Sequence, residues 1–166
     1  MKRLLLMRHA KSSWKDSNLP DRERPLKKKG ERDAERMAKM LKDKNLVPDL
    51  ILTSTAVRAV ETAKLLTAAC KCGAERIQAL DSLYMAEPTD ILEAIRTYGN
   101  GYKTVMVIGH NPGMEAFLQI INGAVESLPT ASIAYVGARL EDWSEFGKHQ
   151  DGQVKLKKLW RPKDLD

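Results

Sequence analysis

The chain has 166 residues, of which 43% are hydrophobic and 30% charged, values typical of a globular protein, and we expect a single domain over residues 1–166. No apolar run approaches the roughly 18 residues of a membrane span, and Leu4–Met7 is too short an apolar stretch for a secretory signal. We therefore expect a cytoplasmic protein with no membrane partner, in which Cys70 and Cys72 are reduced thiols.

The net charge of +6 is unevenly placed along the chain. Residues 1–44 contain 15 Lys or Arg against 7 Asp or Glu, whereas the remainder is slightly acidic. Such a positive region favours anionic partners. A solvated helix face with alternating charges is the simpler interpretation of most of these residues. With 5% aromatic residues and no recognition motif, the sequence does not indicate a nucleic-acid partner.

Strands and helices alternate in the predicted chain order. The apolar residues 2–7 predict a buried strand, and residues 28–44 repeat apolar side chains at helical spacing. The further predicted strands are 49–53, 76–80, 103–108, 132–140 and 153–160, the last two joined by a polar loop, and the further predicted helices are 57–69, 88–98 and 114–121. Ser54 or Thr55 is expected to cap the helix at 57–69. This order predicts an α/β fold, a three-layer sandwich with a mostly parallel central sheet flanked by helices.

Two of the three histidines directly follow strand-like segments. His9 comes after the strand at 2–7, and His110 comes after the strand at 103–108. Because ligands of open α/β sheets bind at the carboxyl ends of the strands, both histidines are candidates for one site. A single histidine is more often a hydrogen-bonded structural residue, so the prediction of a site depends on the presence of two histidines at two strand ends.

Arginines stand at the same positions. Arg8 adjoins His9, and Arg58 falls in the first turn of a predicted helix, where free N–H groups favour an anion. Two guanidiniums and a helix start suit a phosphate group, although Arg58 could simply pair with Glu61 on the surface. A metal site is disfavoured, because Glu115 is the sole carboxylate at ligand spacing near either histidine.

These residues lie in motifs that resemble a known family. MRHAKSSW, TSTAVRAVETAKLL and VIGHNPG are similar to the arginine-histidine, serine-arginine-threonine and second-histidine segments of the histidine phosphatase superfamily, which includes phosphoglycerate mutases. RPLKKKG (24–30), SLYMA (82–86) and PTASIA (129–134) resemble its short SixA-type phosphohistidine phosphatases. The resemblance covers about residues 2–140.

The resemblance implies a metal-independent phosphatase without a cofactor. It implies that His9 is the nucleophile that forms a phosphohistidine intermediate, and that Arg8, Arg58 and His110 hold the phosphoryl oxygens. A neutral imidazole can attack without a strong base, and a protonated His110 would add positive charge to the pocket. The resemblance also places Ser12 at a position where many relatives have a small hydroxyl residue near the phosphate. The expected partner is a histidine-phosphorylated protein or a small phosphorylated substrate, bound by a monomer.

Two departures from the family pattern refine this expectation. Ala10 replaces the glycine after the histidine, which should be tolerated where φ is negative. The glutamate that serves many relatives as proton donor is missing from LYMAEP, where Glu87 is displaced. An alkoxide leaving group needs such an acid, whereas imidazole, with a pKa near ~6.5, leaves with little help. The missing acid therefore favours phosphohistidine as the substrate.

Three alternatives remain at this stage. A small-molecule phosphomonoesterase could use Glu87 or Asp16 as its acid, and a phosphate- or nucleic-acid-binding module could carry the same residues without turnover.

The long loop from Lys11 to Lys29 is expected at the mouth of the site. Within it, Trp14 is either a recognition surface or a partly buried packing residue.

Overall fold

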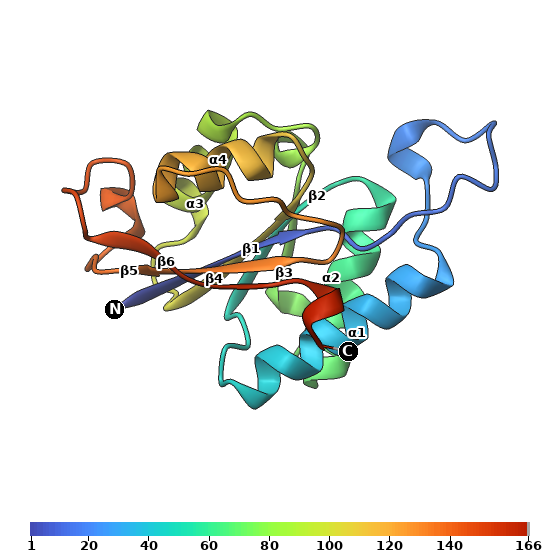
Figure 1. Cartoon of the computed structure of the whole chain (residues 1–166), viewed down its shortest axis with the longest axis horizontal. Coiled ribbons are helices and arrows are strands. Elements are labelled where there is room, and N and C mark those ends of the chain that lie inside the picture. The colour runs from blue at the N-terminus through green and yellow to red at the C-terminus, as the bar shows by residue number, and fades with distance from the viewer. Residues whose placement is uncertain (166) are drawn as a thin grey trace.

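A six-stranded sheet with helices on both faces forms the centre of the computed structural model, which describes residues 1–165 (Figure 1). The strand order is β3-β2-β4-β1-β5-β6. The strands are β1 (Lys2–Arg8), β2 (Leu50–Ser54), β3 (Ile77–Leu80), β4 (Thr104–Gly109), β5 (Ile133–Ala138) and β6 (Val154–Trp160). β1 to β4 pair in parallel, while β5 is antiparallel to both β1 and β6. The predicted α/β fold with a mostly parallel sheet is confirmed.

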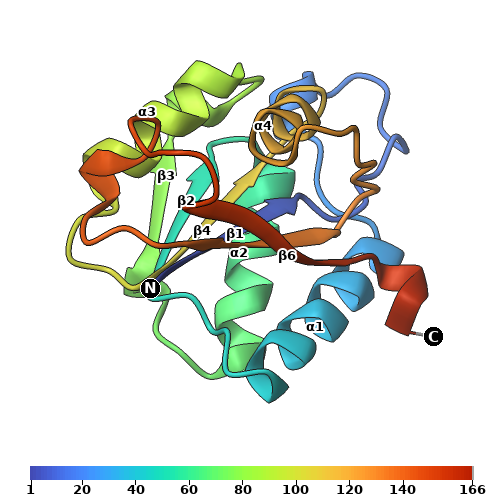
Figure 2. The ribbon, with the colours of Figure 1, turned by 60° about the vertical axis from the view of Figure 1, so that its left-hand side comes forward.

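Four α-helices form the outer layers. Helices α1 (Lys28–Asp43) and α2 (Val57–Cys70) cover one face of the sheet, and α3 (Pro88–Tyr98) and α4 (Gly113–Asn122) cover the other (Figures 1 and 2). Each helix lies within one or two residues of its predicted bounds at both ends. In residues 1–165 no helix is both long enough and apolar enough to cross a membrane.

Strand β1 is buried on both faces. Leu4 and Leu6 belong to the hydrophobic cluster under α3 and α4, whereas Leu5 and Met7 belong to the cluster under α1 and α2. This alternation explains the uninterrupted apolar run, because a central parallel strand has no solvent face. All four side chains are fully buried, and burial of each stabilises the fold by about 1.5–3 kcal/mol. The strand is thus a rigid support for the residues that follow it.

The carboxyl ends of β1, β2 and β4 meet at one edge of the sheet. In the parallel register Arg8 is opposite Gly109, and Thr53 is opposite Ile108. The residues that follow these strands therefore emerge side by side from segments far apart in sequence.

Two local expectations were wrong. Ser54 ends β2, and the N-cap of α2 is Ala56; neither Ser54 nor Thr55 caps the helix, although the Ser54 hydroxyl accepts the Ala56 N–H at 3.1 Å. The segment between β5 and β6 is not simply a polar loop. It contains the 3₁₀ helix Trp143–Glu145, and Trp143 is fully buried in the cluster under α3 and α4 because its ring covers apolar surface at the end of α3.

The loop that follows β1 is fixed against the start of α1. The Lys27 N–H donates to the Lys11 carbonyl at 3.0 Å, and Ser13 N–H donates to the Pro25 carbonyl at 2.8 Å. Gly30 allows this approach, since a Cβ at that position would lie 2.1 Å from the Lys11 carbonyl oxygen. The loop is consequently held beside the carboxyl edge of the sheet.

Candidate active site

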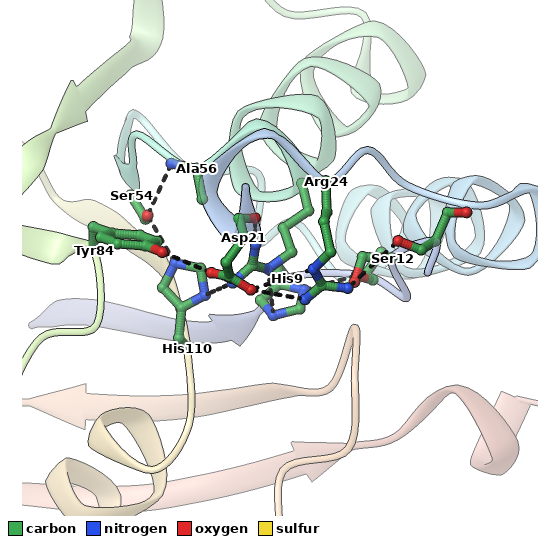
Figure 3. Close-up of polar contacts among 11 residues, drawn as sticks. His9, Ser12, Asp21, Arg24, Ser54, Ala56, Tyr84 and His110 are labelled. Carbon is green, nitrogen blue, oxygen red and sulfur yellow. Dashed lines mark hydrogen bonds and ion pairs between the residues drawn. The ribbon is translucent and has the colours of Figure 1, made fainter. Parts of the chain in front are cut away.

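A cavity of about 790 Å³ opens at the carboxyl ends of β1, β2 and β4. The structure brings together in its wall all five residues singled out from the sequence, namely Arg8, His9, Ser12, Arg58 and His110. The loop 11–29 borders the cavity through Lys11, Trp14 and Lys27, as expected for a segment at its mouth. Figure 3 shows His9, His110, Asp21 and Arg24 directed toward a common centre.

The ring of His9 is held in one orientation. Its Nδ1 lies 2.7 Å from the Ala10 carbonyl oxygen, and Arg58 Nε–H donates to its Nε2 at 3.4 Å. A carbonyl can only accept and an arginine can only donate, so the proton is on Nδ1 and the lone pair is on Nε2. The Ala10 backbone has negative φ, which confirms that alanine is tolerated after the histidine.

His9 is neutral at physiological pH. Its side chain is 6% exposed, and burial lowers its pKa to about 3, with the charges of His110, Arg58 and Arg8 acting in the same direction and the hydrogen bond to Ala10 opposing them. An imidazole that carries a lone pair, and not a proton, on Nε2 is the form that can act as a nucleophile.

Arg58 connects the two histidines to Asp21. Besides its contact with His9, its Nη2 lies 3.4 Å from His110 Nδ1 and 3.0 Å from Asp21 Oδ2, and its Nη1 donates to the Asp21 carbonyl at 2.7 Å. The alternative that Arg58 pairs with Glu61 is wrong. The Glu61 carboxylate instead accepts the Leu26 N–H at 3.1 Å, which draws it toward the loop and away from the cavity.

His110 is neutral as well. Burial, followed by the charge of Arg58, lowers its pKa to about 4, against a smaller opposite effect of Asp21. Since Arg58 can only donate to Nδ1, the proton lies on Nε2, which donates to the Ser54 hydroxyl at 2.7 Å. His110 therefore does not add the positive charge that a protonated ring would bring to the pocket. A bound phosphoryl dianion would favour its protonation by direct attraction.

Arg8 is oriented by the segment before β5. Its Nη1 donates to the Leu128 carbonyl at 3.2 Å, and the same oxygen accepts Asn111 Nδ2 at 3.0 Å. Glu115, considered above as a metal ligand, accepts the Leu128 N–H at 2.7 Å. This carboxylate therefore fixes the backbone that orients Arg8.

Ser12 also lines the cavity, where it is paired with Arg24. Arg24 Nη1 donates to the Ser12 hydroxyl at 2.8 Å, and the guanidinium lies 3.5 Å from the centre of the Trp14 ring. The Trp14 side chain is 74% exposed, so its interpretation as a packing residue is wrong. It covers Arg24 from solvent, a cation–π arrangement that steadies the guanidinium.

Sequence reasoning assigned no role to three residues that build the site: Tyr84, and Asp21 and Arg24 of the loop expected at its mouth. Tyr84 O–H donates to Asp21 Oδ2 at 2.6 Å, and this hydrogen bond, with those from Arg58 and Arg24, lowers the Asp21 pKa to about 2. Asp21 is therefore an ionised acceptor. Arg24 and Tyr84 lie within the RPLKKKG and SLYMA motifs, so the motifs themselves were the available signal.

Neither carboxylate proposed above as an acid lines this cavity, although Glu87 lines an adjoining pocket together with His110 and Asn111. Glu87 is exposed at the N-cap of α3, in a capping box with Asp90, and Asp16 is an exposed turn residue that accepts the Asn18 N–H at 3.0 Å. Within residues 1–165 no group of three or more His, Cys, Asp or Glu side chains is placed to hold a metal ion.

Comparison with known sequences agrees with this arrangement. The family model of the histidine phosphatase superfamily (branch 1) matches residues 4–90. An uncharacterised chloroplastic protein of Arabidopsis thaliana is 35% identical over 170 residues, which cover 97% of this chain and 78% of the relative. An uncharacterised protein of Mycobacterium tuberculosis is 34% identical over 140 residues, 77% of this chain and 84% of the relative.

Solved structures share the fold over nearly the whole chain. SixA of Agrobacterium tumefaciens matches with a TM-score of 0.81 and 29% identity, over 97% of this chain and 98% of that protein. A SixA protein histidine phosphatase in complex with tungstate matches with a TM-score of 0.82 over 99% of both chains. At 21% identity, this likeness concerns the fold alone.

Proposed function

Because the chain belongs to the histidine phosphatase superfamily, as a SixA-like phosphatase, we propose that it removes the phosphoryl group from phosphohistidine on a protein, through a covalent intermediate on His9. One observation carries the proposal: a neutral His9 presents its Nε2 lone pair to a cavity whose single carboxylate, that of Asp21, is held ionised.

The first step transfers the phosphoryl group to His9. Nε2 attacks phosphorus, the bond from phosphorus to the leaving nitrogen breaks, and His9 becomes a phosphoimidazolium that keeps its Nδ1 proton. The Ala10 carbonyl accepts a hydrogen bond from this Nδ1–H, with a distance of 2.7 Å between Nδ1 and the oxygen, and so stabilises the charge on the ring. Arg8 and Arg58 neutralise the phosphoryl oxygens, which is the main requirement of phosphoryl transfer.

The second step is hydrolysis of the intermediate. Water attacks phosphorus, the bond to Nε2 breaks, and dihydrogen phosphate leaves with both protons of the water. His9 returns to its neutral form with the proton still on Nδ1, so the cycle balances without a metal ion or a cofactor. His110 and Ser12 complete the proposed phosphate site, with Arg24 beside Ser12.

The leaving group explains the preference for phosphohistidine. A phosphohistidine protonated on its second ring nitrogen leaves as neutral imidazole, whereas an alkoxide needs a proton that commonly contributes a factor of about 10²–10⁴ to the rate. Asp21, with its pKa of about 2, has no proton to give at neutral pH, and Asp16 does not line the cavity. Glu87 lies in the adjoining pocket, where its carboxylate accepts a backbone N–H at the start of α3. These observations support hydrolysis of phosphohistidine over hydrolysis of a sugar phosphate.

The test compares a phosphohistidine protein, an aryl phosphate and a sugar phosphate as substrates of the wild-type protein. We expect kcat/KM to be at least about 100-fold higher for phosphohistidine than for the sugar phosphate. His9→Ala should abolish turnover of all three, while His149→Ala, which changes a histidine outside the cavity, should retain it. Full activity of His9→Ala would refute the nucleophile, and equal turnover of sugar phosphate and phosphohistidine would refute the substrate.

A further inference from the structure

The cavity carries more positive charge than a phosphoryl group can neutralise. Among residues 1–165, six Lys or Arg side chains line it, against the single carboxylate of Asp21. A phosphoryl dianion contributes a charge of roughly −2. Because like charges held together are unfavourable without counter-charges, the excess indicates a ligand with further negative groups.

The excess charge lies at the mouth. Lys11, Lys15 and Lys27 are exposed, and within residues 1–165 their ammonium groups have no ion pair or hydrogen bond. The three arginines in the wall, by contrast, are buried or held by fixed acceptors such as the Leu128 carbonyl. The lysines are thus free to bind an anion that extends beyond the phosphoryl group.

Exposed apolar side chains accompany these lysines. Trp14 is 74% exposed and Met85 is 55% exposed, and both line the same cavity. Tryptophan and methionine are enriched at protein–protein contacts, and the rim of such contacts is polar and solvent-accessible. The volume of about 790 Å³ leaves room for more than one side chain of a ligand. A peptide segment fits this combination better than a compact phosphorylated metabolite.

We propose that Lys11, Lys15 and Lys27 form a second anion-binding subsite, which binds carboxylates that flank the phosphorylated side chain of a protein substrate. This inference rests on the proposed function and defines the kind of protein that the site accepts. Trp14 and Met85 contact the substrate backbone and apolar atoms between the carboxylates and the phosphoryl group.

The experiment measures kcat/KM for two phosphohistidine peptides of equal length, one with Asp and Glu flanks and the other with Asn and Gln. We expect the acidic peptide to be preferred about tenfold at low ionic strength, and the preference to shrink as salt is added. The triple variant Lys11→Gln/Lys15→Gln/Lys27→Gln should lose the preference. The control Lys39→Gln/Lys64→Gln/Lys158→Gln, with the same change in net charge outside the cavity, should keep it.

A second measurement separates this inference from the proposed function. Unphosphorylated versions of both peptides compete with hydrolysis of an aryl phosphate, a reaction that needs phosphatase activity but no phosphohistidine. Stronger inhibition by the acidic peptide, lost in the cavity triple variant, supports the subsite even where neither phosphohistidine peptide is hydrolysed. Equal kcat/KM and equal inhibition for the two peptides overturn it.

Discussion

The stability of the protein should fall between pH 7 and pH 5 because two buried histidines remain neutral. Burial lowers the pKa of His9 to about 3 and that of His110 to about 4, whereas a histidine in the unfolded chain titrates near ~6.5. In the window between these values the unfolded state binds protons that the folded state does not. The stabilising contribution is therefore complete above the unfolded pKa and is lost as the pH falls.

The expected effect is large. From pH 7 to pH 5 each histidine lowers the free energy of unfolding by about 2 kcal/mol, which gives about 4 kcal/mol for the pair. Small domains have free energies of unfolding of about 5–15 kcal/mol, so the loss should be measurable. Asp21 does not contribute here, because its pKa of about 2 confines its effect to more acidic conditions.

Urea unfolding at pH 7 and pH 5, followed by circular dichroism, tests this reasoning. His9→Gln and His110→Gln should each remove about half of the difference between the two pH values, and the double variant should remove nearly all of it. Every carboxylate is retained, so carboxylate titration cancels in the comparison. If His9→Gln shows the full wild-type difference, His9 is not a neutral buried imidazole, and its assignment as a nucleophile loses its physical basis.

Three further predictions concern the residues that support the site and its independence of metal ions. Ser54→Ala removes the acceptor 2.7 Å from His110 Nε2, and should lower the free energy of unfolding by about 1–3 kcal/mol and reduce kcat/KM, as seen in urea unfolding and aryl phosphate hydrolysis. Gly30→Ala places a Cβ 2.1 Å from the Lys11 carbonyl and should cost about 1–3 kcal/mol, measured as a lower Tm; an unchanged Tm would contradict the close approach. Exhaustive treatment with a chelator should leave phosphatase activity unchanged, and a loss that Mg²⁺ or Zn²⁺ restores would refute metal independence.

The sequence was most informative where burial dictates residue type. The apolar run Leu4–Met7 predicted β1 because a strand covered on both faces needs apolar side chains at every position. His9 and His110 could be placed at one edge because parallel strands end together. Position relative to a strand end is a local property of the chain, and it is therefore readable without the structure.

Side-chain contacts between different loops were harder to predict from the sequence. The only partner that the sequence suggested for Arg58 besides a phosphate was Glu61, three residues along the same helix, but Arg58 pairs with Asp21 from a loop 37 residues earlier. Tyr84 reaches the same carboxylate from the segment after β3. These contacts depend on how the loop 11–29 folds over the sheet edge, which in turn depends on the close approach of Gly30 to Lys11. Such an approach between distant residues cannot be predicted from the spacing of residues in the sequence.

Arg58 shows why the site must be considered as a unit. The same guanidinium donates to His9 Nε2, contacts His110 Nδ1 and pairs with Asp21, so it fixes the tautomers of both histidines as well as one carboxylate. Asp21 thus supplies the counter-charge of the buried Arg58 guanidinium, which offsets the cost of burying a cation.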